Sequence, residues 1–263
     1  MSGTQLSLSH TRFLKYDNPH KITQTTDLTF YTGIKAFNDN QIAVAVPEFV
    51  VFESKISSKN TRRAIGSVDR ESGQEWEIAF TGFGYHTNLP RIDGGVNASW
   101  GAFKTFGEAH NVLHLKADAG FRLTNDEFGL SRFFFGGFGN RKLENRSVKQ
   151  YRETSRFPGA PSYSLSSNRF LKLTLENNLP PLRFNKIRFG QHALSHIDAS
   201  WFSQGLVFGK GSENVWLNLG AQINLRFQHW FNLESTLSAG AAQVWNNGQA
   251  SREWFLSLKL LRN

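Results

Sequence analysis

The sequence predicts an all-β protein, an antiparallel transmembrane β-barrel of about twelve strands in which residues 1–263 form one domain. Three observations lead to this fold class. Apolar and polar residues alternate over runs of about ten residues, and clusters of Asn, Asp and Gly separate these runs. No long stretch has the 3.6-residue period of an amphipathic helix.

Composition excludes several other classes of protein. Aromatic residues make up 14% of the chain, with 24 Phe and 7 Trp, whereas disordered chains are poor in aromatics. A helical membrane protein is excluded because no run of about 18 apolar residues is present. The chain has no Cys, and therefore no disulfide, thiolate metal site or cysteine nucleophile. The net charge of +9 is compatible with nucleic acid, anionic lipid or a basic water-filled interior.

The clearest alternation lies in two runs. Residues 215–227 are apolar at every odd position and mostly polar between, which is the period of a strand with one apolar side. Those odd positions are Val215, Leu217, Leu219, Ala221, Ile223, Leu225 and Phe227. Residues 113–123 alternate in the same way, with leucine, alanine and phenylalanine on one side and His114, Lys116, Asp118, Gly120 and Arg122 on the other.

The remaining strands follow from weaker alternation or from strand-like composition. In chain order, the expected strands are residues 5–13, 28–37, 41–52, 75–85, 96–102, 113–123, 131–139, 170–177, 193–207, 215–227, 231–241 and 254–260.

Turns and loops are predicted between these strands. Turn-forming Asn, Asp and Gly concentrate at residues 38–40, 88–95, 125–129, 209–214 and 246–249. Residues 54–73 are polar and charged, and we expect an extended loop there. The largest irregular segment is residues 140–168, which is rich in arginine and lysine. A loop of that length is usually functional or disordered.

The length of the strands favours a membrane barrel over a soluble one. A transmembrane strand needs about 9–11 tilted residues, with an apolar side toward lipid and a polar side toward the lumen. Strands of soluble domains average about 5–6 residues. A large soluble antiparallel barrel or sandwich is the alternative, because its strands would alternate as well, but they should be shorter.

Four motifs follow one another between residues 133 and 201: FFFGGFGN, VKQYRETSRFPGA, NRFLKLTLENNLPP and HALSHIDASW. In this order they resemble the C-terminal barrel of the bacterial surface antigen family, part of the superfamily of outer-membrane assembly factors and two-partner-secretion transporters. Gly136 and Gly137 match that family's paired glycines. Asp198 matches the acid of its F-x-D motif, with His196 in place of the aromatic residue. The chain looks like a divergent member of a family whose barrels have about sixteen strands.

The resemblance implies that residues 140–168 fold back into the lumen. In the family, an arginine of this loop pairs with the aspartate of the F-x-D strand. Arg152 is our first candidate for the arginine, Arg156 is the second, and Asp198 is the expected partner. Such a pair would make a charge-assisted hydrogen bond that holds the loop inside and closes the pore. The polar side chains expected to line the lumen are Lys172, Glu176 and His196.

The function that the resemblance implies is the insertion or translocation of polypeptides at the outer membrane of a Gram-negative bacterial cell, with a loop-gated lumen. The expected partners are outer-membrane lipid and polypeptide clients or accessory periplasmic or surface proteins, and no nucleic acid. Two alternatives remain open. One is a non-catalytic pore or structural barrel that anchors a surface complex, and the other is a soluble basic β-barrel binding protein.

No catalytic, cofactor or metal site is predicted, and we expect the protein not to be an enzyme. His192 and His196 share a strand face but lie roughly 13 Å apart by strand rise, too far to share a metal ion. Residues 136–139 are rich in glycine, yet no helix follows them, so they do not form a phosphate-binding loop. A G-x-S-x-G nucleophile motif is absent.

Overall fold

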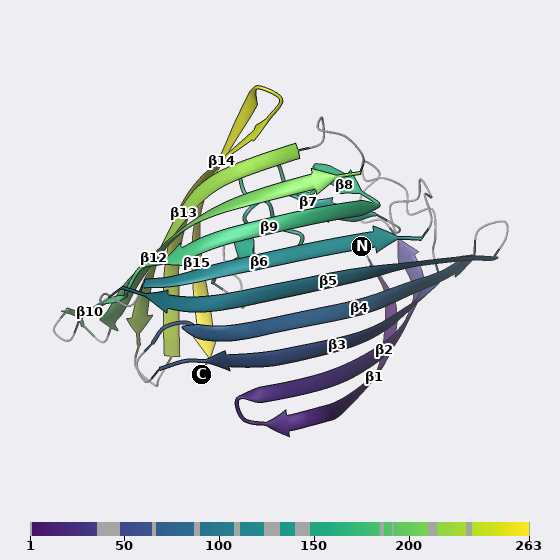
Figure 1. Cartoon of the computed structure of the whole chain (residues 1–263), viewed down its shortest axis with the longest axis horizontal. Coiled ribbons are helices and arrows are strands. Elements are labelled where there is room, and N and C mark those ends of the chain that lie inside the picture. Colours follow the sequence, from purple (N-terminus) through teal and green to yellow (C-terminus); the bar gives the residue numbers. More distant parts are fainter. Residues whose placement is uncertain are drawn as a thin grey trace.

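A computed structural model of the chain consists almost entirely of β-strands (Figure 1). The structure describes residues 2–35, 48–64, 67–86, 90–107, 111–123, 132–139, 148–184, 187–190, 192–209, 215–229 and 233–262. The long strands are β1 (Ser2–Asp17), β2 (His20–Lys35), β3 (Phe49–Arg62), β4 (Ser72–His86), β5 (Pro90–Phe106), β6 (Asn111–Arg122), β9 (Arg169–Asn178), β12 (His192–Phe208), β13 (Val215–Gln228), β14 (Leu233–Asn246) and β15 (Gln249–Arg262). Four strands are short, namely β7 (Phe133–Phe135), β8 (Leu165–Ser167), β10 (Leu182–Arg183) and β11 (Arg188–Phe189), and η2 (Gln150–Arg152) is a single 3₁₀ turn.

One sheet of 13 strands forms a wall, and its path runs β1-β2-β3-β4-β5-β6-β9-β12-β13-β14-β15. β10 and β11 pair with β12, while β7 and β8 form a separate two-stranded sheet. The predicted all-β antiparallel architecture is confirmed. Figure 1 shows the wall curling, with β14 and β15 passing behind the strands that precede them. Within the described residues β1 and β15 do not pair with each other, so the sheet is not closed.

The two faces of the wall have opposite chemistry. The convex face is apolar and exposed, as shown by Leu217 and Leu219 of β13, which are 54% and 51% exposed. The concave face is polar and buried, as shown by Asn218, Gln222 and Asn224 of the same strand. The alternation predicted for residues 215–227 therefore gives the strand two distinct sides, and its leucines lie at the surface. No helix among the described residues is long and apolar enough to cross a membrane.

The described residues between β6 and β9 lie against the concave face. We call residues 132–139 and 148–168 the plug segment, which contains β7, η2 and β8 (Figure 1). Two clusters of buried side chains join it to the wall. In one cluster Phe135 and Phe157 pack with Phe170, Leu206 and Phe208, and in the other Phe138 and Tyr151 pack with Phe202 and Phe255. Burial of each such side chain contributes about 1.5–3 kcal/mol, so the plug segment is an integral part of the fold.

Two predicted elements are wrong. Residues 131–139 do not form a wall strand, because β7 covers only Phe133–Phe135 and belongs to the plug segment. Gly136 and Gly137 end it, since their φ angles of 141° and 68° do not fit a strand. The loop predicted for residues 54–73 is a strand in its first half. β3 continues to Arg62 because Ile56 pairs with Ile78 and extends the apolar row on the convex face.

The turn predictions have mixed outcomes. Asn247 and Gly248, with φ of 45° and 80°, join β14 and β15, which confirms the turn expected at residues 246–249. The turn predicted at residues 88–95 is wrong from residue 90 onward, because β5 begins at Pro90, and proline is tolerated as the first residue of a strand. The turns predicted at 38–40 and 125–129 lie outside the described residues, as do 210–214 and 140–147.

Candidate functional site

An arginine of the plug segment and a glutamate of the wall make the central contact of the candidate site. Arg152 ends η2, and Glu176 points from β9 to the concave side. The guanidinium donates from Nε to Glu176 Oε2 at 2.8 Å and from Nη2 to Oε1 at 2.6 Å, a bidentate arrangement. Nη2 also donates to Oδ2 of Asp69, in the connection from β3 to β4, at 2.5 Å. Glu176 is fully buried, so this contact is shielded from bulk water.

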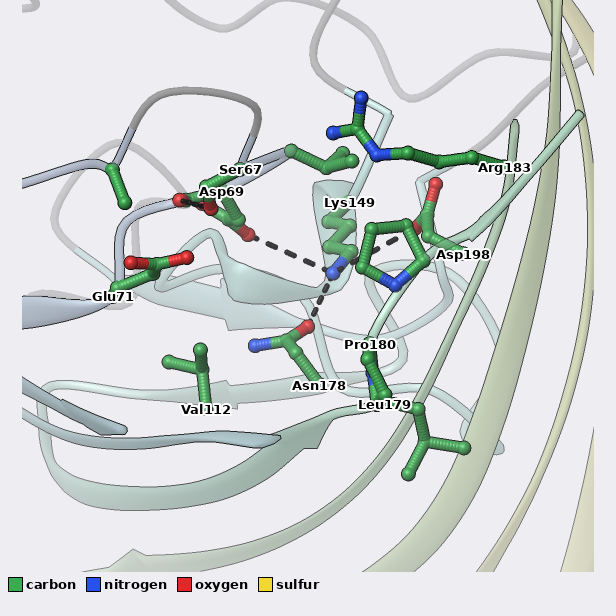
Figure 2. A pocket seen from close by; sticks show the side chains of 13 residues that line it. Ser67, Asp69, Glu71, Val112, Lys149, Asn178, Leu179, Pro180, Arg183 and Asp198 are labelled. Carbon is green, nitrogen blue, oxygen red and sulfur yellow. Dashed lines mark hydrogen bonds and ion pairs between the residues drawn. The ribbon is translucent and has the colours of Figure 1, made fainter. Parts of the chain in front are cut away.

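Lys149 brings a second cation to the same carboxylates. It lies one 3₁₀ turn before the arginine of η2, and side chains three residues apart eclipse in a 3₁₀ turn. Figure 2 shows its ammonium between Asp69 and Asp198, whose Oδ2 atoms lie 3.6 and 3.9 Å from Nζ. The ammonium also donates to Asn178 and lies 3.5 Å from Glu176 Oε1. Lys149 therefore connects the plug segment with β9, with β12 and with the β3–β4 connection.

The predicted pair of Arg152 with Asp198 is replaced by two separate contacts. Arg152 pairs with Glu176, whereas Asp198 accepts a hydrogen bond from Asn224 Nδ2 at 2.7 Å and has Lys149 as its cationic neighbour. Strand register explains the change. The pairing of β9 with β12 ends at Asn178 opposite Ser200, so Asp198 lies one concave position beyond it, and Lys149 occupies the space between the two acids. We call Asp69, Lys149, Arg152, Glu176 and Asp198 the charged latch.

The charged forms of these groups stabilise one another. Burial by itself raises the pKa of Asp69, but the charges of Arg152 and Lys149 outweigh it and lower this pKa from 3.8 to about 2. Burial by itself lowers the pKa of Arg152, but the charges of Glu176 and Asp69 raise it well above its usual value. Arg152 and Asp69 are therefore ionised at neutral pH.

The wall also binds the main chain of the plug segment. Nζ of Lys172, buried on β9, donates to the carbonyl oxygens of Glu153, Thr154 and Arg156 at 2.9, 3.2 and 2.5 Å. Five more wall side chains donate to plug carbonyls at 2.7–3.0 Å: Gln222 to Val148, Gln204 to Tyr151, Lys116 to Arg152, Asn218 to Pro158 and Ser251 to Gly159. Together these bonds pair wall donors with plug carbonyls along residues 148–159, which fixes the path of the segment.

The paired glycines let two parts of the plug segment approach each other. A Cβ on Gly136 would lie 2.0 Å from the carbonyl oxygen of Pro161, and a Cβ on Gly137 would also meet a neighbouring atom at 2.6 Å. The turn that the two glycines form directs the backbone N–H of Phe138 to Oε1 of Glu253 on β15, at 3.1 Å. The glycine motif therefore acts in docking the plug segment and has no direct contact with the charged latch.

Two further predicted residues lie outside the charged latch. Arg156 stays within the plug segment, because its Nε is 3.5 Å from Oε2 of Glu153 and its guanidinium lies 5.5 Å from the ring centre of Tyr163. His196 is buried on the concave face of β12, and its Nε2 is 4.0 Å from Oδ1 of Asp198.

Three residues of the site were not identified from the sequence. Lys149 precedes Arg152 by three positions, but this spacing has a meaning only once a 3₁₀ turn is known to lie there. Glu253 neighbours the apolar run that begins at Trp254, so strand alternation places it on the polar side and could have found it. Asp69 lies in a stretch with many other charged residues, and nothing in the sequence distinguishes it.

Two cavities border the plug segment. One, of about 320 Å³, opens beside Lys149 and is also lined by Arg183 and Pro180 (Figure 2). The other, of about 360 Å³, lies between Thr154 of the plug segment and the strands β3 to β5. Space therefore remains on the β3–β5 side of the plug segment. In the described part of the chain, no group of three or more His, Asp or Glu side chains is arranged to hold a metal ion.

No family model matches the chain, and no curated protein matches it either. The resemblance to the surface antigen family therefore stays a prediction that depends on the motifs between residues 133 and 201.

Proposed function

We propose that the chain forms the wall of a transmembrane β-barrel in the bacterial outer membrane. The convex face supports this proposal. Leu171, Leu173 and Leu175 of β9 are 47%, 50% and 37% exposed, and similar rows follow on the neighbouring strands. In water, each Å² of exposed apolar surface on this face costs about 25 cal/mol of free energy compared with burial. Lipid hydrocarbon removes this cost because it covers the face with apolar groups. The wall strands have 10 to 17 residues, enough to cross a bilayer at a tilt.

Closure of the sheet is part of this proposal. Lipid offers no hydrogen-bond partner to the edge of a strand, so an open edge is not stable in the hydrocarbon region. In the membrane, the outer edges of β1 and β15 are therefore paired, with each other or with further strands.

The barrel of this proposal inserts or translocates polypeptides past a plug segment that can be released, with polypeptide clients as its partners. The charged latch is the observation that carries this step. A buried ion pair adds little net stability compared with apolar packing. Loss of one partner, however, leaves an uncompensated buried charge and is strongly destabilising. Acidic groups of a client can therefore replace the three acidic latch residues as partners of Lys149 and Arg152. This exchange releases the plug segment and opens the lumen.

A specific observation favours a second function, that of a permanently closed barrel that anchors a surface complex. Phe135, Phe138 and Phe157 of the plug segment are fully buried against the wall. Release would expose these rings to the lumen. A structural barrel has no need to expose them.

A reversible crosslink distinguishes the two functions. Thr154 Oγ1 of the plug segment donates to Asp118 Oδ1 of β6 at 2.8 Å, and the chain contains no native Cys. The variant with Thr154→Cys and Asp118→Cys is reconstituted in vesicles and treated with a short, cleavable reagent that joins two thiols. Passage of reduced and alkylated lysozyme, an unfolded polypeptide probe, is then measured before and after cleavage of the reagent. Each single-cysteine variant, treated in the same way, is the matched control.

A releasable plug predicts that the crosslink stops passage, that cleavage restores it, and that the single-cysteine variants keep it throughout. If no variant transports the probe although all are inserted, the structural barrel is the better account. A protein that stays in solution without detergent and shows no heat-dependent change in gel mobility would refute the membrane barrel itself.

A further inference from the structure

We propose that the convex face of β12 to β15 carries a binding site for one anionic glycerophospholipid, with an acyl chain between Trp201 and Trp254 and the phosphate on Arg252. This inference rests on the proposed function, because it requires that the convex face lies in a bilayer.

Four residues of one row shape the site. Trp201 is opposite Ala221, Ala221 is opposite Ala241, and Ala241 is opposite Trp254. Two indole rings thus flank two methyl groups, and a groove of about 650 Å³ opens between them. Leu219 extends its apolar lining. Trp254 is 80% exposed, so one wall of the groove stands clear of the sheet. Trp201 and Trp254 lie three strand spacings of about 4.7–4.9 Å apart, so the alanine floor between them leaves room for an unbranched acyl chain.

A cation lies at one end of the groove. Arg252 precedes Trp254 by two residues on β15 and therefore lies on the same face. Its Nε donates to Oε1 of Gln243, the residue opposite, at 2.9 Å. This bond uses one of the five guanidinium N–H donors. The ion pairs found among the described residues do not include Arg252. A phosphate is the anion that a guanidinium fits best, since two N–H groups can bind two of its oxygens.

The position of Arg252 along the strand is that of a lipid headgroup. From Trp254 onward the outward residues of β15 are apolar, namely Leu256, Leu258 and Leu260, all of them exposed. The apolar run therefore ends at a tryptophan, and the next outward residue is a cation. This order is typical of the border between hydrocarbon and headgroups. A chain in the groove would place its phosphate beside the guanidinium, whereas a neutral lipid would leave the arginine without an anion.

Quenching by brominated lipid tests the site, because bromine on an acyl chain quenches a tryptophan only in contact. The protein is reconstituted in mixed bilayers of phosphatidylcholine and phosphatidylglycerol, with bromine on the chains of one lipid or the other. The fluorescence that disappears in the variant Trp254→Phe reports on the groove. We expect phosphatidylglycerol to bind there about fivefold better than phosphatidylcholine, which is the factor expected for one arginine near anionic headgroups.

Two variants separate the groove from general attraction to charge. Arg252→Gln should abolish the preference. Lys104→Gln should keep it, because Lys104 lies on the same convex face but on β5, away from the groove. Ala241→Leu fills the floor and should reduce quenching of Trp254 by both lipids.

Three outcomes would overturn the site. Equal quenching by both lipids in the wild type, a preference that survives Arg252→Gln, or unchanged quenching in Ala241→Leu would each refute the groove while leaving the membrane barrel intact. If neither lipid quenches any tryptophan, the protein is not in the bilayer, and the proposed function fails together with the site.

Discussion

Replacing Glu176 by Gln should release the plug segment. The substitution keeps the size of the side chain and removes the charge that two cations share. Arg152 loses a bidentate partner with contacts of 2.8 and 2.6 Å, and Lys149 loses a carboxylate 3.5 Å away. Asp69 remains in contact with both cations. The expected result is a plug segment that is docked less firmly in a barrel whose wall is unchanged.

The size of the effect follows from burial. Removing one partner of a buried ion pair costs about 3–5 kcal/mol. The lower end, about 3 kcal/mol, applies here because Asp69 still compensates part of the charge and the side chain of Arg152 is 22% exposed. Since 1.4 kcal/mol corresponds to a factor of ten, the ratio of released to docked plug should rise about 100-fold.

Single-channel recording in planar bilayers measures this ratio as the time spent in the high-conductance state. Glu77→Gln is the matched control, because Glu77 lies on the wall, at β4, and its ion-pair partner is Lys55 of β3, 3.9 Å away. Both variants should keep the heat-dependent gel mobility of the wild type. The reasoning is refuted if Glu176→Gln spends no more time open than Glu77→Gln. In addition, the effects of Glu176→Gln and Arg152→Gln should not add in the double variant, because the two residues form one contact.

Three further predictions concern the docking of the plug segment. The folded pKa of Asp69 is lowered from 3.8 to about 2, so the Asp69 carboxylate stabilises the docked plug segment by about 2 kcal/mol. This contribution is complete above pH 3.8 and is lost as pH falls through about 2. The time spent in the high-conductance state should rise in this window, and Asp69→Asn should remove the rise. Lys172→Met removes three hydrogen bonds of about 1 kcal/mol each, so trypsin should cleave the plug segment about 100-fold faster, and an unchanged rate would contradict the role of these bonds. Gly137→Ala brings a Cβ within 2.6 Å of Ser162 Oγ at a φ of 68° and should lower the free energy of unfolding in urea by about 1–3 kcal/mol. Gly205→Ala, with its nearest neighbour at 3.5 Å, should leave that free energy unchanged, and equal effects of the two substitutions would contradict the account.

Much of the wall could be predicted because alternation is a local pattern. Residues 215–227 were expected as a strand, and β13 spans Val215–Gln228. The segment 131–139 could not be placed in the same way. Its three phenylalanines read equally well as part of a wall strand or as part of an inner hairpin. Only the pairing of β7 with β8, which lie far apart in the sequence, decides between the two.

Alternation also placed single residues of the candidate site, but it could not pair them. Lys172 and Glu176 lie on the concave face because they alternate with leucines along β9. The partner of Arg152 depends on the path of the plug segment across the lumen. That path is set by contacts with several strands at once. Arg152 therefore pairs with Glu176 and not with Asp198 because of long-range contacts, which the sequence near Arg152 does not indicate.

The hydrogen bonds from Lys172, Gln204 and Asn218 to plug carbonyls have a consequence for how such a chain can change over generations. A carbonyl oxygen is common to all twenty amino acids, so these bonds constrain no side chain in residues 148–159, and positions there outside the charged latch and the buried aromatic clusters can vary. Mutations can accumulate there without moving the backbone. Related proteins can therefore differ in the side chains on the inner surface of the barrel while they keep the same wall and the same path of the plug segment.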